Sequence, residues 1–189
     1  MTENKVEKNG RVSMSSVKTK PTDFMRTVQD YPVKGVNFYD VNSLFASDLW
    51  TSEVEDIAER IKESLEFMPT HIVGIESRGF VLGAALSQEL DIPFVMIRKK
   101  GAKYPGKLLE ESYELEYGTD TLTLQEGILG HTSRVLIADD LVATGGSMNA
   151  SKRLCEQAGA LVLGGVTIVN LKYLNDEELE LLSSVEIEE

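Results

Sequence analysis

The sequence has little of what secreted, membrane-spanning or nucleic-acid-binding proteins depend on. Its single cysteine, Cys155, excludes an internal disulfide framework, because one thiol has no second thiol to pair with. No apolar run reaches the roughly 18 residues that a membrane-spanning helix needs. Residues 1–20 are polar and offer no apolar stretch that could act as a secretory signal. We therefore expect a cytoplasmic protein without a membrane partner.

Basic side chains are also scarce. Lys and Arg number 19 against 31 Asp and Glu, which gives a formal net charge of −12. Residues 171–189 contain seven acidic side chains and one basic, whereas residues 1–20 contain five basic and two acidic. Because Lys and Arg contacts to phosphate supply most non-specific affinity for nucleic acid, we expect no nucleic-acid partner. Any anionic ligand has to be bound by a local arrangement of groups.

The length and composition are those of one globular domain. The chain has 189 residues, of which 42% are hydrophobic and 26% are charged. It contains no internal repeat and no low-complexity tract. We expect a flexible polar tail over residues 1–21 and one folded domain over residues 22–189.

Short apolar segments alternate with amphipathic ones along the chain. The predicted strands are residues 71–75, 92–97, 134–138 and 160–169, and the predicted helices are residues 23–29, 52–65, 80–90 and 147–157. Thr22 is the expected N-cap of the first helix. The alternation predicts an α/β fold with a central, mostly parallel sheet flanked by helices. In such sheets ligands bind beyond the carboxyl ends of the strands.

Residues 99–125 do not fit this alternation. A stretch rich in Lys, Gly and Pro is followed by two segments with a period of two, at residues 113–117 and 121–124. The pattern predicts a hairpin, with residues 101–107 as its mobile tip. Because long excursions from compact domains are often active-site lids, we expect this hairpin to act as a flexible lid.

The most informative segment is residues 135–148, VLIADDLVATGGSM. Its small-residue turn lets the backbone approach a phosphate, and the helix that follows directs unpaired N–H groups at it. The two acids repel a phosphate but accept hydrogen bonds from sugar hydroxyls. A ribose 5-phosphate satisfies both halves. The alternative is that the two acids only cap a helix and the glycines only turn the chain. That alternative leaves the combination of acids, small-residue turn and helix start unexplained.

This string resembles the 5-phosphoribosyl 1-pyrophosphate (PRPP) motif of type I phosphoribosyltransferases, and its Ala-Thr-Gly-Gly form is similar to that of the adenine-specific members. The likeness covers about residues 23–175, with further motifs in the family's order at residues 31–32, 35–40, 76–80, 97–101, 112–113 and 115–118. It implies the type I phosphoribosyltransferase fold and a reaction of purine salvage. In that reaction adenine and PRPP give AMP and pyrophosphate with the help of Mg²⁺. It also implies a homodimer, with Arg98 near the partner chain.

The resemblance also implies roles for individual residues. Asp139 and Asp140 are candidate catalytic groups at the ribose hydroxyls, and the candidates for the 5-phosphate are Ala143, Thr144, Gly145, Gly146 and Ser147. The candidates for pyrophosphate are Glu76, Ser77, Arg78, Arg98, Lys99 and Lys103. Mg²⁺ is expected to bind mainly through the substrate's pyrophosphate, with no dedicated protein ligand. The candidates for adenine are Asn37, Phe38, Tyr39 and Leu171, and Glu116 is the catalytic candidate for handling the purine proton.

Three positions depart from the family's pattern, and three alternatives stay open. Tyr39 stands where the family often has Arg, Asn170 stands where it usually has Glu, and Ala102 is an extra residue ahead of Lys103. One alternative is a transferase for hypoxanthine, guanine or xanthine, although the hypoxanthine–guanine enzymes carry an acid where this chain has Ala143. Another is a non-catalytic regulator that binds the sugar phosphate. The third is a fragment similar to a phosphoribosyl pyrophosphate synthetase.

Overall fold

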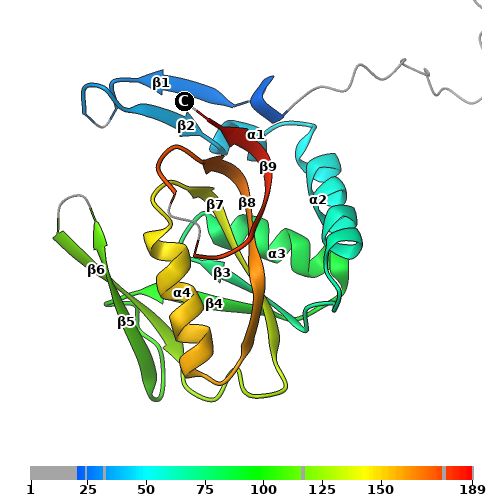
Figure 1. The fold of residues 1–189 in the computed structure, drawn as a ribbon, viewed down its shortest axis with the longest axis vertical. Helices are drawn as coiled ribbons and strands as arrows, with labels where there is room; N and C mark the ends of the chain where they lie inside the picture. Colours follow the sequence, from blue (N-terminus) through cyan, green and yellow to red (C-terminus); the bar gives the residue numbers. More distant parts are fainter. Residues whose placement is uncertain (1–20, 24, 32, 116–117, 176–177, 189) are drawn as a thin grey trace, which may run out of the picture.

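The computed structural model describes residues 21–188 except 24, 32, 116–117 and 176–177. Its centre is a seven-stranded sheet of order β5-β6-β4-β3-β7-β8-β9 (Figure 1). The strands are β3 (His71–Ile75), β4 (Phe94–Lys99), β5 (Leu108–Leu115), β6 (Gly118–Gln125), β7 (Arg134–Val142), β8 (Leu161–Leu171) and β9 (Leu181–Ile187). The five strands from β4 to β9 in this order are parallel, and the β5–β6 hairpin continues the sheet antiparallel to β4. The predicted mostly parallel α/β sheet is confirmed.

Helices cover both faces of the sheet. Helices α2 (Trp50–Ser64) and α3 (Gly79–Leu90) pack on one face, and α4 (Gly146–Gln157) packs on the other (Figure 1). Successive strand residues point to opposite faces, so Ile72 belongs to the core beneath α2 and α3, while Val73 belongs to the core beneath α4. None of the helices in the described residues is long and apolar enough to cross a membrane.

Most of the predicted elements are present within a few residues of their expected bounds. The segment over residues 23–29 was predicted wrongly as a helix: Pro21–Asp23 forms one 3-10 turn, η1, and Arg26–Gln29 is a strand, β1. Strand β1 pairs antiparallel with β2 (Asn37–Asp40), ahead of the short helix α1 (Asn42–Phe45). This cross-strand pairing, helped by an ion pair of 3.1 Å between Arg26 Nη2 and Asp40 Oδ2, outweighs the weak local preference for helix.

The predicted hairpin is present, but residues 101–107 are not its tip. Strand β5 pairs with β6 along its whole length, from Leu108 opposite Gln125 to Leu115 opposite Gly118. Residues 101–107 instead connect β4 to the far end of β5. The strand begins there because Pro105 cannot donate a backbone hydrogen bond and Gly106 turns the chain with φ 86°. Because Leu122 of β6 pairs with Lys99 at the end of β4 and the two strands are antiparallel, the end of the hairpin where Leu115 pairs with Gly118 extends beyond the carboxyl end of β4.

Candidate active site

Two adjacent aspartates form the acidic part of the site. Asp139 and Asp140 lie inside β7, which continues to Val142 and does not end at residue 138 as predicted, because the apolar Leu141 and Val142 extend its pairing with β8. Both side chains are buried, and the backbone N–H of Asp140 donates to Oδ1 of Asp139 at 2.9 Å. Burial raises the pKa of Asp139 well above its ordinary value, and the adjacent charge of Asp140 raises it further.

Arg78 faces this acidic pair from the neighbouring strand connection. Its Nε lies 2.8 Å from Oδ2 of Asp140, an ion pair whose N–H is not aligned on that oxygen as a hydrogen bond. Burial raises the pKa of Asp140, and the positive charge of Arg78 opposes that rise. Gly79 allows the approach, since a Cβ there would lie 2.6 Å from the carbonyl oxygen of Ala138 and 3.0 Å from Oδ1 of Asp139. The start of α3 is thereby held against β7.

The predicted phosphate loop joins β7 to α4. Gly145 precedes the helix with φ 81°, a backbone conformation that side chains disfavour, and Gly146 begins the helix. No side chain caps α4 at its N-terminus, so its first N–H groups remain available to a ligand. The loop is therefore a turn with positive φ at Gly145, followed by a helix start without a side-chain cap.

A cleft of about 400 Å³ brings the acidic pair, Arg78 and the start of α4 together. It is lined by Ile75, Glu76, Ser77, Arg78, Lys99, Tyr113, Asp139, Asp140, Leu141 and Ser147. Seven of these ten residues are among the sequence-predicted ribose and pyrophosphate candidates. A second groove lies beside it and includes Thr144, Gly146 and again Tyr113.

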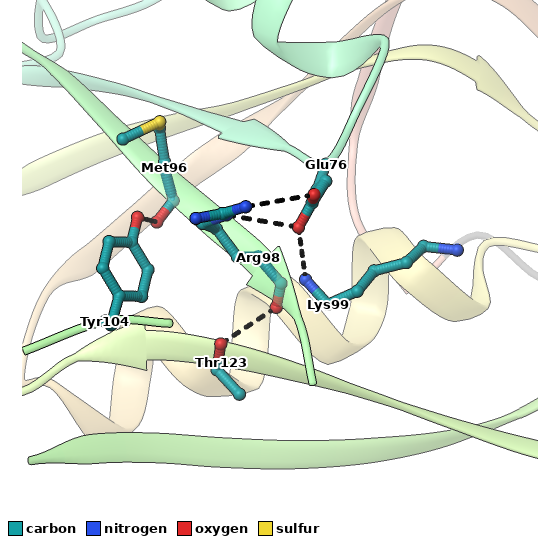
Figure 2. A network of polar contacts seen from close by, with 6 residues as sticks. All are labelled: Glu76, Met96, Arg98, Lys99, Tyr104 and Thr123. Atoms are coloured by element: carbon teal, nitrogen blue, oxygen red, sulfur yellow. Dashed lines mark hydrogen bonds and ion pairs between the residues drawn. The ribbon is translucent and has the colours of Figure 1, made fainter. Parts of the chain in front are cut away.

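Arg98 and Lys99 hold Glu76 from two directions. The Nε and Nη2 atoms of Arg98 each lie 3.4 Å from a carboxylate oxygen of Glu76, and the backbone N–H of Lys99 donates to Oε2 at 2.9 Å (Figure 2). Burial by itself raises the pKa of Glu76, but these donors outweigh it and lower that pKa. The guanidinium of Arg98 also lies over the ring of Tyr104, 5.4 Å from its centroid. Arg98 is therefore bound beside the cleft and not among its lining residues.

The remaining pyrophosphate candidate and the adenine candidates are spread more widely. Lys103 is exposed between β4 and β5 and does not line the cleft. Phe38 lies between Tyr31, whose ring it meets edge-on at 5.2 Å, and Arg78, whose guanidinium carbon is 5.8 Å from its centroid. Tyr39 and Leu171 pack into the core, while Asn37 is exposed. Among these described residues, Phe38 is the adenine candidate in contact with a cleft side chain.

Two residues near the cleft were not predicted. Tyr113 lines both the cleft and the neighbouring groove, and Asp120 contacts Tyr113 and Lys99 from β6. The only signal for Tyr113 was its place in the motif at residues 112–113. Glu116, the predicted proton-handling residue, lies outside the described residues.

The comparisons with known proteins agree with this geometry. A sequence profile described as the phosphoribosyl transferase domain matches residues 40–181, and the chain belongs to the phosphoribosyltransferase family. Within it, the chain is 43% identical over 157 residues to the adenine phosphoribosyltransferase of Rhodospirillum rubrum, covering 82% of this chain and 90% of that protein. It is 43% identical over 155 residues to that of Brachyspira hyodysenteriae, covering 81% and 88%.

Solved structures show the same likeness. The adenine phosphoribosyltransferase of Rhodothermus marinus superposes with a TM-score of 0.77 at 38% identity, covering 87% of this chain and 95% of that one. That of Saccharomyces cerevisiae, complexed with an imino-altritol bisphosphate and adenine, superposes with a TM-score of 0.80 at 32% identity, covering 86% and 94%. The fold is therefore that of the type I phosphoribosyltransferases.

Proposed function

We propose that this protein transfers the 5-phosphoribosyl group of PRPP to adenine, giving AMP and pyrophosphate. The observation that carries the proposal is the single cleft in which the buried Asp139–Asp140 pair, Arg78 and the start of α4 converge. Sugar hydroxyls match the two acids, and phosphate groups match the arginine and the helix N–H groups. The choice of adenine is supported by relatives named adenine phosphoribosyltransferase, one of which has a crystal structure with adenine bound.

The cleft residues divide the work of the reaction by charge. As the bond from the anomeric carbon to pyrophosphate breaks, negative charge grows on the leaving oxygens and positive charge grows on the ribose ring. Arg78 and Lys99 stabilise the negative charge on the leaving pyrophosphate. Asp139 and Asp140 stabilise the positive charge on the ribose ring and accept hydrogen bonds from its 2′- and 3′-hydroxyls. Ala143 to Ser147 hold the 5-phosphate, which places the anomeric carbon at a fixed distance from the base.

The described residues fit a Mg²⁺ ion bound mainly through the substrate. Asp139 and Asp140 offer oxygen atoms, the ligands that Mg²⁺ prefers, next to the place proposed for the ribose. When bound, the ion neutralises part of the pyrophosphate charge. The protein's own part is to bring the positive charges of Arg78 and Lys99 to the same cleft.

The base is proposed to bind beside Phe38, whose ring lies close to Arg78 at the cleft. An aromatic ring stacks well on a purine. The remaining candidates do not line the cleft as the structure stands, so their side chains or backbone would have to move to contact a ligand. They are Leu171, on the face of the base opposite Phe38, and Asn37, Tyr39, Arg98 and Lys103. Glu116 is proposed to manage the purine proton.

We also propose a cytoplasmic homodimer, with residues 1–21 as a tail and residues 22–189 as the catalytic domain, on the strength of the family resemblance.

The experiment is to incubate the purified chain with adenine, PRPP and Mg²⁺ and to follow AMP by chromatography. We expect AMP and pyrophosphate in equal amounts, and loss of both when EDTA is added in excess of Mg²⁺. Formation of ribose 5-phosphate without AMP would instead indicate that the protein binds and hydrolyses PRPP without using adenine.

A further inference from the structure

Two side chains, from the strands on either side of β6, meet at one β6 carboxylate beside the cleft. The ammonium of Lys99, at the end of β4, lies 3.3 Å from Oδ2 of Asp120 on β6. The hydroxyl of Tyr113, on β5, donates to the same oxygen at 3.4 Å. Oδ1 of Asp120 accepts the backbone N–H of Thr121 at 2.8 Å. Lys99 and Tyr113 both line the cleft, whereas Asp120 is not among its lining residues.

Tyr113 extends this cluster to the phosphate loop. A Cβ on Gly146 would lie 3.2 Å from Cδ2 of Tyr113, so the ring packs closely over the first residue of α4. Burial and the nearby charge of Asp120 raise the pKa of Tyr113 to about 12, so its hydroxyl keeps the proton that it donates. One carboxylate therefore contacts a cation on the pyrophosphate side of the cleft and a ring on its 5-phosphate side.

The adjacent lysine shows that this pairing is selective. Lys100 points to the other face of the sheet edge, where its ammonium lies 2.9 Å from Oε2 of Glu110, and neither residue lines the cleft. Lys99 has a long side chain that is 56% exposed, and without Asp120 it would be free to adopt many rotamers. Glu76, Asp139 and Asp140 line the same cleft and would attract a freed ammonium away from a ligand.

We propose that Asp120 is a positioning residue for PRPP binding. Its carboxylate orients the Lys99 ammonium toward the pyrophosphate and holds the Tyr113 ring against the phosphate loop. The inference rests on the proposed function for the identity of the ligand. It does not depend on which base is used. It assigns to the β5–β6 hairpin a part in binding the sugar phosphate in addition to any part in covering the site.

The test is the affinity of the full chain for Mg²⁺-PRPP without adenine, measured by calorimetry. Asp120→Asn keeps the shape and loses the charge, and we expect it to weaken binding by roughly tenfold, the size of a partly exposed charge-assisted contact. Asp120→Glu should recover part of the loss. Glu110→Gln is the matched control, since it breaks another lysine–carboxylate ion pair of the hairpin, away from the cleft, and should leave the affinity unchanged.

Coupling distinguishes positioning from a loss of folding. Asp120→Asn should have a much smaller effect on affinity in a Lys99→Gln background, no larger than that of Tyr113→Phe, because only the contact with Tyr113 is left to lose. Tyr113→Phe probes the second contact with the ring retained and should weaken binding less than Asp120→Asn. The melting temperatures of all variants are compared with that of Glu110→Gln.

Affinity of Asp120→Asn within twofold of the wild type, tighter binding, or full additivity with Lys99→Gln would each overturn the inference. Tighter binding would show that Asp120 competes with the ligand for Lys99. A wild-type chain that binds PRPP but makes no AMP would contradict the proposed function and leave this inference standing. A wild-type chain that binds no PRPP would overturn both.

Discussion

Nε of Arg78 and Oδ2 of Asp140 lie 2.8 Å apart, which joins the start of α3 to the acidic pair on β7. The carboxylate side chain is 5% exposed and the guanidinium side chain is 45% exposed. The arginine can therefore neutralise a buried acid on one side while it offers further N–H groups to an anion on the other. This pair connects the two halves of the proposed PRPP site.

Replacing either acid should weaken catalysis. Asp139→Asn and Asp140→Asn keep the side-chain shape but lose charge-assisted hydrogen bonds to the ribose hydroxyls, each worth about 1.5–3 kcal/mol. We expect kcat/KM to fall by about 10- to 150-fold in each variant. Steady-state rates with varied PRPP measure this, with Glu59→Gln on the exposed face of α2 as the control. Wild-type rates in both variants would remove the ribose from this position.

Asp139→Asn should also stabilise the folded protein at neutral pH. Folding raises the pKa of Asp139, chiefly through burial, so the folded state binds the proton more tightly than the unfolded state. The associated stability is fully present below the ordinary carboxyl pKa of about 3.9 and is lost as pH rises through the folded value. Asn at this position has no charge to bury.

Asp139→Asn should accordingly raise the melting temperature by a margin that grows as the pH increases from 5 to 8. A gain of 1 kcal/mol corresponds to about 2–4 °C in a chain of this size. Calorimetric scans of the wild type, Asp139→Asn and Glu59→Gln at several pH values provide the measurement. A margin that is constant with pH, or that shrinks as pH rises, would show that burial of this charge does not limit stability.

Gly146→Ala should impair PRPP binding through the Tyr113 ring. The added methyl group would lie 3.2 Å from Cδ2 of Tyr113 and 3.4 Å from the carbonyl oxygen of Glu114, so the hairpin has to move by a few tenths of an ångström. We expect KM for PRPP to rise about 10-fold, equivalent to about 1.4 kcal/mol. Gly130→Ala is the control, because a Cβ there meets nothing within 4 Å. Equal KM values for the two variants would argue against close packing at the loop.

Much of the fold was predictable because its patterns are local. Strand β3 and helix α2 are recognisable from the spacing of apolar residues within each segment, and their observed bounds differ from the predicted ones by two residues at most. Strand β1 was missed because four residues are too few to separate a period of 2 from one of 3.6. It is a strand only through its pairing with β2.

The candidate site could be proposed from the sequence where its residues are contiguous in the chain. Asp139, Asp140 and the loop up to Ser147 form one string whose chemistry is readable without a fold. The ion pair of Arg78 with Asp140, the contact of Tyr113 with Gly146 and the pairing of Lys99 with Asp120 join residues from separate strands. No spacing rule in the sequence predicts such contacts, because strand order and side-chain packing create them.

Glu116→Gln should lower the rate and leave substrate affinity largely intact. Gln keeps the size and one hydrogen-bonding oxygen but does not take up a proton at neutral pH. Proton handling contributes about 10²–10⁴-fold, so we expect kcat to fall by that order. Turnover and adenine affinity are compared with the wild type across pH. A rate within about threefold of the wild type, under 1 kcal/mol in barrier, would leave Glu116 without a catalytic role.

The central claim is that the cleft transfers phosphoribosyl to adenine. The most direct measurement is pyrophosphate release from PRPP and Mg²⁺ with adenine, hypoxanthine, guanine, xanthine or orotate supplied one at a time. We predict release with adenine that exceeds the rate with each other base by at least about tenfold, a difference of about 1.4 kcal/mol in the barrier. Faster release with guanine or hypoxanthine, or no base-dependent release with any of the five, would contradict it.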